Sequence, residues 1–431
     1  MNNWGRATKV GTCTFIFMCF VLWITPLIIS FVHFTNNEIG FDLNNIKNRI
    51  IFDFNIFSCL LCWIGFQLIL SLLPDFIHKL TSFYVGGKRT GQTTPAGFIL
   101  EYNINGLQAW IITHIIYFTA TYIDIIDPSI IAKNFNKIFI CANVIGYLLA
   151  IFSYYKAHNF PTHIEDNKQS NSIIYDFVMG IEFNPRIWNI DFKLFFNGRP
   201  GIIAWTMINY SFAFLQYEKF GSISNSMILV NILQTLYVID FFWNENWYLK
   251  TVDIAHDHFG WYLAWGDCVW LPFFYTLQST YLSYNYVVLS NMQFIIILLA
   301  GIIGYTIFRL TNYQKDYFRR EKNPTIFGKT PEYLEVKYVT SNEETHTSKL
   351  LCDGLWKYAR HMNYSGDLLL SLTYGLSCGF ESLIPYYYFF FMLTLLILRC
   401  YRDEHRCYKK YGYKWTEYCK IVPYRLVPFV Y

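Results

Sequence analysis

Long apolar runs, separated by shorter polar stretches, recur along almost the whole chain. Each run holds roughly 17 to 25 residues, enough for an α-helix to cross about 30 Å of hydrocarbon. The pattern predicts an all-α, polytopic membrane protein with about ten transmembrane helices. We place the spans at residues 11–34, 51–74, 106–126, 137–155, 199–217, 224–242, 259–281, 286–308, 366–380 and 382–398.

Very little chain separates the last two predicted spans. Residues 379–382 read Gly-Phe-Glu-Ser and Pro385 follows, so a continuous straight helix is not expected here. The pattern leaves two possibilities open, one kinked helix or a short helical hairpin.

Lysine and arginine residues are divided unevenly between the two sides of this arrangement. With the N-terminus in the cytoplasm, only five of the 34 basic residues fall outside: Lys47, Arg49, Lys133, Lys137 and Lys219. Cytoplasmic loops of membrane proteins carry an excess of Lys and Arg. We therefore expect both termini in the cytoplasm, together with the polar loops 76–105, 157–198, 243–258, 309–365 and 399–431.

The composition agrees with lipid as the main solvent, because 15% of the residues are charged, against about 25% in soluble domains. A net charge of +4, scattered among the spans, is too small to indicate a nucleic-acid surface. No internal repeat or long flexible linker divides the chain. We therefore treat it as one membrane domain.

One junction between spans concentrates ionisable residues. Residues 240–267 hold several carboxylates and two histidines among aromatic residues. Charged groups in a membrane are functional candidates by default, although the tryptophans also suit an interfacial aromatic belt. Helical spacing would place Asp253, Asp257 and Gly260 on one face with His256 beside Asp253, forming a short proton relay. No metal is expected, because the ten histidines contain no HxxHH run.

The C-terminal section combines cations with aromatic residues. Lys315 and Arg319 are four residues apart on a predicted helix, so both cations share one face and could clamp a phosphate. A second basic stretch contains Arg399, Arg402, Arg406, Lys409 and Lys410. The alternative interpretation is a patch attracted to anionic lipid. The acids within the stretch weaken that alternative, because a carboxylate such as Asp403 repels lipid headgroups but can accept hydrogen bonds from a ribose.

Two nucleotide-binding motifs are not supported. Gly328-Lys329-Thr330 resembles the end of a P-loop, but the first glycine of that motif would fall at Asn323. We interpret this segment as a turn. No G-x-G-x-x-G follows a predicted strand, so a Rossmann-type dinucleotide site is not indicated either.

Nine stretches, taken in order, resemble the sterol reductase family from about residue 84 to the end of the chain. They are YVGG (84–87), TPAG (94–97), YNINGLQAW (102–110), GIEFNPR (180–186), DFKLFFNGRPG (191–201), WYLKTVD (247–253), HDHFGWY (256–262), ARHMNYSGD (359–367) and RDEHRCYKKYG (402–412). Residues 1–83 match the family weakly, residues 84–308 resemble its membrane core, and residues 309–431 resemble its cofactor-binding section.

The resemblance implies a ten-helix protein of the endoplasmic reticulum membrane that uses NADPH. FFNGRPG (195–201) and FWNENWYL (242–249) look like the family members that reduce the C7=C8 double bond of 5,7-diene sterols in sterol biosynthesis, as in the conversion of 7-dehydrocholesterol to cholesterol. The expected partners are the sterol and the lipid bilayer, with no nucleic acid and no metal.

The resemblance also implies cofactor contacts at the positions that match the family motifs. They are Lys315, Arg319, Leu351, Trp356, Asn363, Tyr364, Asp403, Cys407, Tyr408, Lys409, Lys410, Tyr411 and Tyr418. Several of these residues are also the ones that the charge pattern selects. Cations would read the phosphates here without a glycine-rich turn.

Reduction of a ring double bond requires a hydride and a proton. A carboxyl group in a dry site keeps its proton near neutral pH and can donate it. Glu245 and Asp257 are therefore the first candidate proton donors, followed by Tyr248 and Tyr262.

Three alternative functions are weighed against this one. A reductase of another sterol double bond, at C14 or in the side chain, would differ only in its pocket. A non-catalytic sterol-binding scaffold is disfavoured because few polar residues precede the first span. A receptor or transporter is disfavoured by the complete cofactor motif.

Overall fold

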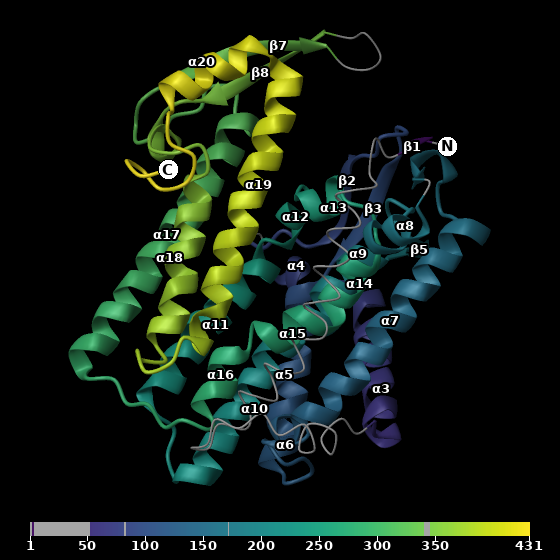
Figure 1. Cartoon of the computed structure of the whole chain (residues 1–431), viewed down its shortest axis with the longest axis vertical. Coiled ribbons are helices and arrows are strands. Elements are labelled where there is room, and N and C mark those ends of the chain that lie inside the picture. The colour runs from purple at the N-terminus through teal and green to yellow at the C-terminus, as the bar shows by residue number, and fades with distance from the viewer. Residues whose placement is uncertain (1, 4–51, 82, 171, 340–344) are drawn as a thin grey trace. The chain divides into compact units, whose positions relative to one another are not determined.

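The computed structural model describes residues 2–3, 52–81, 83–170, 172–339 and 345–431. The first predicted span, residues 11–34, lies outside them. The described chain is mostly helical and divides into two compact units, Met1–Tyr286 and Val287–Tyr431 (Figure 1). We describe each unit by itself.

Among the described residues, five segments are long and apolar enough to cross a membrane. They are Phe54–Leu80, Phe135–Asn159, Asn225–Trp243, Asn291–Arg320 and Ile384–Tyr411. Each coincides with a predicted span. The other predicted spans in this part of the chain are helical but shorter or interrupted, so a multi-helix membrane protein is confirmed and the number ten stays a prediction.

The described part of the first unit is built from five longer helices and several short ones. The longer helices are α3 (Phe54–Leu72), α5 (Gly106–Tyr122), α7 (Phe135–Asn159), α10 (Ile203–Phe220) and α11 (Asn225–Trp243). The short ones are α4 (Ile77–Leu80), α6 (Ile130–Lys133), α8 (Ile173–Met179), α9 (Phe192–Phe196), α12 (Glu245–Tyr248), α13 (Val252–Ala255), α14 (Trp261–Trp265), α15 (Leu271–Phe274) and α16 (Leu277–Leu282). The predicted span 259–281 is thus a series of short helices, with a π-helical turn at Gly266–Trp270.

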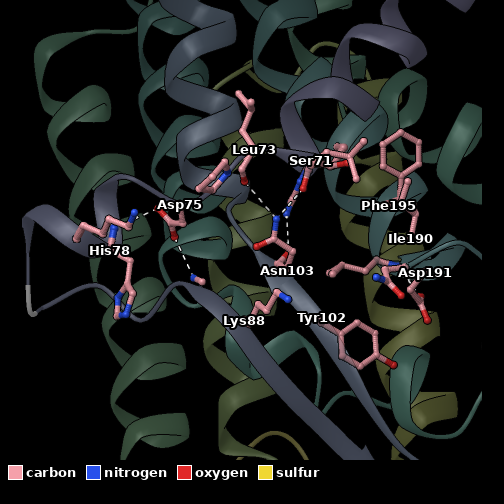
Figure 2. A pocket seen from close by; sticks show the side chains of 17 residues that line it. Ser71, Leu73, Asp75, His78, Lys88, Tyr102, Asn103, Ile190, Asp191 and Phe195 are labelled. Atoms are coloured by element: carbon pink, nitrogen blue, oxygen red, sulfur yellow. Dashed lines mark hydrogen bonds between the residues drawn. The ribbon is translucent and has the colours of Figure 1, made fainter.

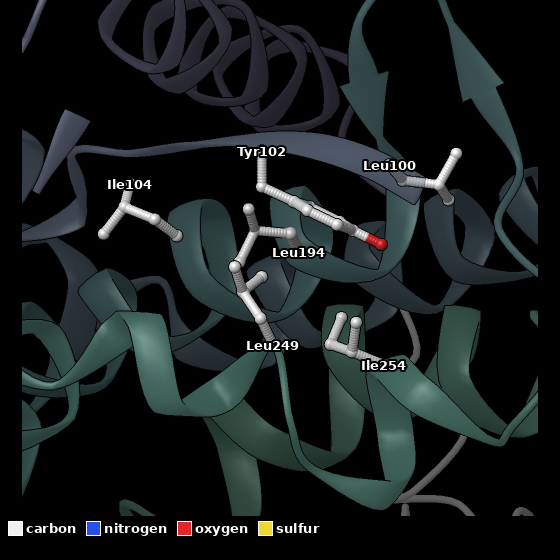
Figure 3. Close-up of a cluster of buried hydrophobic side chains, with 6 residues drawn as sticks. All are labelled: Leu100, Tyr102, Ile104, Leu194, Leu249 and Ile254. Atoms are coloured by element: carbon white, nitrogen blue, oxygen red, sulfur yellow. The ribbon is translucent and has the colours of Figure 1, made fainter. Parts of the chain in front are cut away.

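A β-hairpin in the first unit departs from the predicted all-α pattern. Strands β2 (Gly87–Thr93) and β3 (Ile99–Ile104) pair antiparallel, and Gly97 turns the chain between them with a φ of 97°. Alternate residues of β3 face inward. They pack with side chains from α9 and from the segment after α12, forming the cluster Leu100, Tyr102, Ile104, Leu194, Leu249 and Ile254 (Figure 3).

Three short strand pairings complete the β-structure of the described residues. In the first unit β4 (Lys168–Gln169) pairs with β1 (Asn2–Asn3), and β5 (Arg186–Ile187) pairs with β6 (Ile190–Asp191). In the second unit β7 (Tyr333–Val339) pairs antiparallel with β8 (Thr345–Leu351).

The second unit contains three long helices and one shorter helix. They are α17 (Asn291–Arg320), α18 (Met362–Leu376), α19 (Tyr387–Tyr411) and α20 (Tyr413–Ile421). Ser290 and Gln293 form a capping box that starts α17. Helix α18 packs on both α17 and α19 (Figure 1).

Glycines bring α17 and α18 unusually close together. A Cβ atom on Gly304 would lie 2.7 Å from the backbone nitrogen of Leu370, and one on Gly366 would collide with the backbone of Phe308. Small residues allow this kind of backbone approach between membrane helices. The two helices therefore meet without an intervening layer of side chains.

Two features left open or inferred from the sequence are settled in the second unit. Ile326 and Lys329 exchange two backbone hydrogen bonds around Phe327 and Gly328, which have φ values of 51° and 78°, so the predicted turn is confirmed. The last two spans form a hairpin of separate helices, because α18 ends at Leu376 and α19 begins at Tyr387.

Candidate cofactor site and proton donors

Three helices of the second unit contribute charged and polar side chains to one cluster. The end of α17 supplies Lys315, the start of α18 supplies Asn363 and the last turns of α19 supply Asp403. Lys315 interacts electrostatically with Asp403, Arg406 and Cys407. The residues predicted to bind the cofactor from three distant stretches of sequence are therefore brought together.

An aromatic platform supports Lys315. Its ammonium group lies 4.4 Å from the centre of the Trp356 ring, within the range of a cation–π contact. The Trp356 indole is buried and donates a hydrogen bond to the carbonyl oxygen of Thr311 at 2.9 Å. The ring is thus fixed to α17, one turn from the lysine that it supports.

The start of α18 joins the same cluster through amide and ring contacts. The Nδ2 atom of Asn363 donates to the Oδ1 atom of Asn312 on α17 at 3.1 Å. The ring of Tyr364 stacks on the ring of His361, with 5.1 Å between centroids and 9° between planes. These contacts fix the first turn of α18 against α17.

Helical spacing on α19 gathers the polar groups around Asp403. Its Oδ1 atom accepts a hydrogen bond from Arg406 at 2.8 Å, three residues later, and the Cys407 sulfur lies 3.9 Å from Oδ2. Residues three and four apart share one helix face. The carboxylate therefore orients an arginine while Oδ2 faces the cluster.

The remaining predicted cofactor residues fall into a buried group and an exposed group. Tyr418 is buried and donates from its hydroxyl to the carbonyl oxygen of Leu351 at 3.1 Å. Tyr411 donates to Ser348 at 3.5 Å, and the Lys410 ammonium lies 4.0 Å from the Tyr338 ring centre. The structure leaves Arg319, Tyr408 and Lys409 exposed to solvent.

A buried ion-pair network behind this cluster was not singled out in the sequence. Arg360 donates to Glu404 at 2.5 Å and to the carbonyl oxygens of Val422 and Pro423 at 2.6 and 2.8 Å. Arg425 donates to both oxygens of Glu404, at 3.0 and 2.9 Å. Arg360 lies inside the ARHMNYSGD stretch and Glu404 inside the RDEHRCYKKYG stretch, which were the available signals.

The proton-donor candidates all belong to the first unit. Glu245 is fully buried at the start of α12. Its Oε1 atom accepts from Arg199 at 2.5 Å, and its Oε2 atom accepts from the backbone nitrogen of Gly106 at 2.8 Å. Arg199 is also held by Asn105 at 3.0 Å. Because both carboxylate oxygens accept hydrogen bonds, Glu245 is placed as the anion of a buried ion pair.

The predicted relay on one helical face around Asp257 is wrong. Helix α13 ends at Ala255, and the backbone nitrogen of Phe259 instead donates to the carbonyl oxygen of Glu182 at 3.0 Å. Gly260 passes so close to Gly180 that a Cβ atom at either position would collide with the other backbone. This close crossing pulls residues 256–260 out of a helix.

Lys193 holds the segment that carries Asp257. Its ammonium group donates to the carbonyl oxygens of Ile254 and Asp257 at 2.7 and 2.8 Å, and lies 4.5 Å from the Phe183 ring centre. The side chain is buried, and burial lowers the pKa of Lys193 from 10.5 to about 8. Three nearby acids oppose the shift, among them Asp191.

Alkaline pH should stabilise the first unit through Lys193. The folded-state pKa lies below the unfolded value, so between about 8 and 10.5 the unfolded chain binds more protons and stability rises with pH. We expect a gain of about 2 kcal/mol between about pH 7.5 and 9.5. Thermal unfolding in detergent of the wild type and Lys193→Met should show this gain in the wild type only. Equal pH slopes in the two proteins would contradict the assignment.

Both tyrosine candidates are half-buried. The Tyr248 ring meets the Phe241 ring edge-on at 5.3 Å and packs against the cluster that contains Tyr102 and Leu194. Tyr262 lies on α14, next to the buried Trp261. A phenol carries its proton at neutral pH and so can donate it without any ion pair being broken.

A cavity of about 480 Å³ lies beside the Arg199–Glu245 pair in the first unit. Tyr102, Asn103 and Phe195 are among the residues that line it (Figure 2). Leu194 and Arg199 line it as well. Asn103 ties its wall together by donating to the carbonyl oxygens of Ser71 and Leu73 at 2.7 and 3.3 Å. Two of these lining residues, Tyr102 and Leu194, also belong to the cluster on which Tyr248 packs.

Known proteins resemble this chain over nearly its full length. It matches the Ergosterol biosynthesis ERG4/ERG24 family over residues 7–431. It is 49% identical to 7-dehydrocholesterol reductase of Xenopus laevis, over 99% of this chain and 94% of that protein. It is 50% identical to the probable 7-dehydrocholesterol reductase of Acanthamoeba polyphaga mimivirus, over 100% and 96%.

A second activity occurs among the relatives at lower similarity. The Delta(14)-sterol reductase of Methylotuvimicrobium alcaliphilum is 38% identical over 79% of this chain and 77% of that protein. Every one of these relatives is named as a sterol reductase. The chain therefore belongs to the ERG4/ERG24 family and is a sterol reductase.

Proposed function

We propose that this sterol reductase uses NADPH to reduce the C7=C8 double bond of a 5,7-diene sterol. The assignment of the substrate rests on the 49–50% identity, over nearly the whole chain, to proteins named for 7-dehydrocholesterol. Identity to the Delta(14)-reductase is lower, at 38%, and covers less of the chain.

The polar cluster of the second unit fits a phosphorylated dinucleotide. Lys315 and Arg319 on α17 and Arg406 on α19 are cationic side chains of the kind that bind phosphate. Two buried polar atoms, the Nε2 atom of His361 and the Oδ1 atom of Asn363, have no hydrogen-bond partner among the described residues. Buried polar groups are normally paired, so these atoms support a site built for a polar ligand.

NADPH, when bound, supplies a hydride, and the chain must supply a proton. We infer that Tyr248 donates it, because Glu245 is already engaged as an anion by Arg199 and Gly106. Tyr248 packs against the cluster that includes Tyr102 and Leu194, two residues that line the cavity of the first unit. Burial of the hydrocarbon rings of a sterol against the apolar part of the cavity lining, such as Leu72, Leu73 and Phe195, gains roughly 25 cal/mol per Å².

We further propose a location in the endoplasmic reticulum membrane, with both termini in the cytoplasm. The five apolar segments support a multi-pass protein. The bias of lysine and arginine supports the orientation, since the cofactor cluster then faces the compartment that holds soluble dinucleotide.

The proposed function is tested by expressing the chain in a yeast strain that accumulates a 5,7-diene sterol. We expect the diene absorbance to fall and the 7,8-dihydro sterol to appear. In membranes from these cells, Lys315→Met should raise the KM for NADPH about tenfold, because a cation is lost from the phosphate site. Lys322→Met, at an exposed position just after α17, is the matched control and should leave KM unchanged.

An unchanged diene from well-expressed protein would overturn the C7 assignment. The same membranes are then assayed with a Δ14 sterol. Reduction of that sterol would assign the chain to the reaction named for the Methylotuvimicrobium alcaliphilum relative.

A further inference from the structure

His361 occupies a rigid position at the start of α18. Its backbone nitrogen donates to the carbonyl oxygen of Arg425 at 2.9 Å. Its ring stacks on Tyr364 almost parallel, and only 8% of its side chain is exposed. The direction of the ring is therefore set by its surroundings.

One atom of this ring lacks a partner. Nε2 is buried and forms no hydrogen bond with any described residue. The nearest acid is Asp403, whose Oδ2 atom lies 4.0 Å away, beyond hydrogen-bond distance. The two polar atoms are therefore separated by a gap that is too wide for a direct hydrogen bond.

The charges around the ring define what can enter this gap. Asp403, Lys315, Glu404 and Arg360 all act on His361. Burial lowers the pKa of His361 to about 4, so its ring is neutral at pH 7 and offers one N–H or one lone pair at Nε2. The Asp403 carboxylate repels a phosphate and requires a donor. The gap therefore suits an uncharged group that both donates and accepts.

A hydroxyl group meets both requirements. Its oxygen, placed about 2.8 Å from each atom, would subtend an angle of about 90° and could accept from Nε2–H while donating to Asp403. NADPH carries such groups on its two riboses, and Lys315 lies within the same cluster to hold phosphate.

We propose that His361 and Asp403 together bind one ribose hydroxyl of NADPH, which makes His361 an additional cofactor-positioning residue. This inference rests on the proposed use of NADPH. It assigns the phosphates to the cations of α17 and the hydroxyl to the histidine–carboxylate pair.

The test uses full-length protein in detergent and NADPH analogues that each lack one free ribose hydroxyl. His361→Phe keeps the ring stacked on Tyr364 but removes Nε2, and we expect its KM for NADPH to rise about tenfold with kcat nearly unchanged. His361→Asn, which retains an N–H donor, should recover part of the affinity. The control is His405→Phe, an exposed histidine on α19, which should behave as the wild type.

The analogues separate ligand binding from a structural role. With one of the analogues, the KM of the wild type should rise by the same factor of about ten. The KM of His361→Phe should rise no further with that analogue. The inference would be overturned if, for every analogue, the effects of the analogue and of His361→Phe on KM multiply. An unchanged KM for NADPH in His361→Phe would also overturn it. If the wild type itself binds no NADPH by fluorescence quenching, the cofactor proposal fails together with it, whereas equal binding by wild type and His361→Phe removes this inference alone.

Discussion

Replacing Arg360 with methionine should lower the free energy of unfolding by about 3 kcal/mol, the scale on which a buried ion pair is broken. The guanidinium group holds Glu404 on α19 and the carbonyl oxygens of Val422 and Pro423 after α20. Its loss leaves the buried carbonyl oxygen of Val422 and the partly buried carbonyl oxygen of Pro423 without this donor, although Arg425 still binds Glu404. The measurement is the thermal unfolding midpoint of the purified protein in detergent.

Arg320→Met provides the matched control for this experiment. Arg320 also pairs with acids, Asp316 at 3.3 Å and Glu321 at 3.2 Å, but its side chain is 60% exposed. Solvent screens such pairs, so the unfolding midpoint should not change. Equal midpoints for Arg360→Met and the wild type would show that the tail is anchored by other contacts.

Tyr248→Phe should lower kcat by about 10² to 10⁴, the usual contribution of a general acid, while the KM values for NADPH and sterol change little. The substitution keeps the ring against Phe241 and against the cluster that contains Tyr102, and removes only the hydroxyl. The measurement is single-turnover reduction of a 5,7-diene sterol by purified protein.

Two variants make this experiment decisive. Tyr262→Phe should retain nearly full kcat. A large loss of kcat in Tyr262→Phe instead would identify Tyr262 on α14 as the proton donor. Glu245→Gln should reduce stability first, because the Arg199 cation would then lie buried without its anion. A folded Glu245→Gln protein with normal stability and no activity would return Glu245 to the role of proton donor.

The helical relations among the expected cofactor residues could be predicted from the sequence because their spacing is local. Lys315 and Arg319 share a helix face, as do Asp403 and Cys407, and these regular relations survive in the long helices α17 and α19. The turn at Gly328 was also predicted from a local pattern. The grouping of these residues into one site was inferred from the family resemblance, because spacing along the sequence does not predict that α18 packs against α17 and α19.

The first unit was predicted less well because its decisive contacts are distant in sequence. Arg199 pairs with Glu245, and Lys193 reaches Asp257 across 64 residues. The helical relay failed because Gly260 must cross Gly180, a contact that helical periodicity cannot report. The β2–β3 hairpin was missed because β2 reads GKRTGQT, without the apolar residues that would alternate in a strand, so its sequence is typical of a loop.

Under the proposed function, the close crossing of α17 and α18 makes the apolar interior of the second unit a determinant of cofactor affinity. Gly304 lies three turns before Lys315 on α17, and Gly366 lies one turn after Asn363 on α18. A methyl group added at either glycine would collide with the facing helix and push α17 and α18 apart. We expect this to move Lys315 on α17 away from Asn363 on α18. We therefore expect that substitutions at these glycines alter the spacing of the proposed dinucleotide site, although neither glycine would contact the ligand.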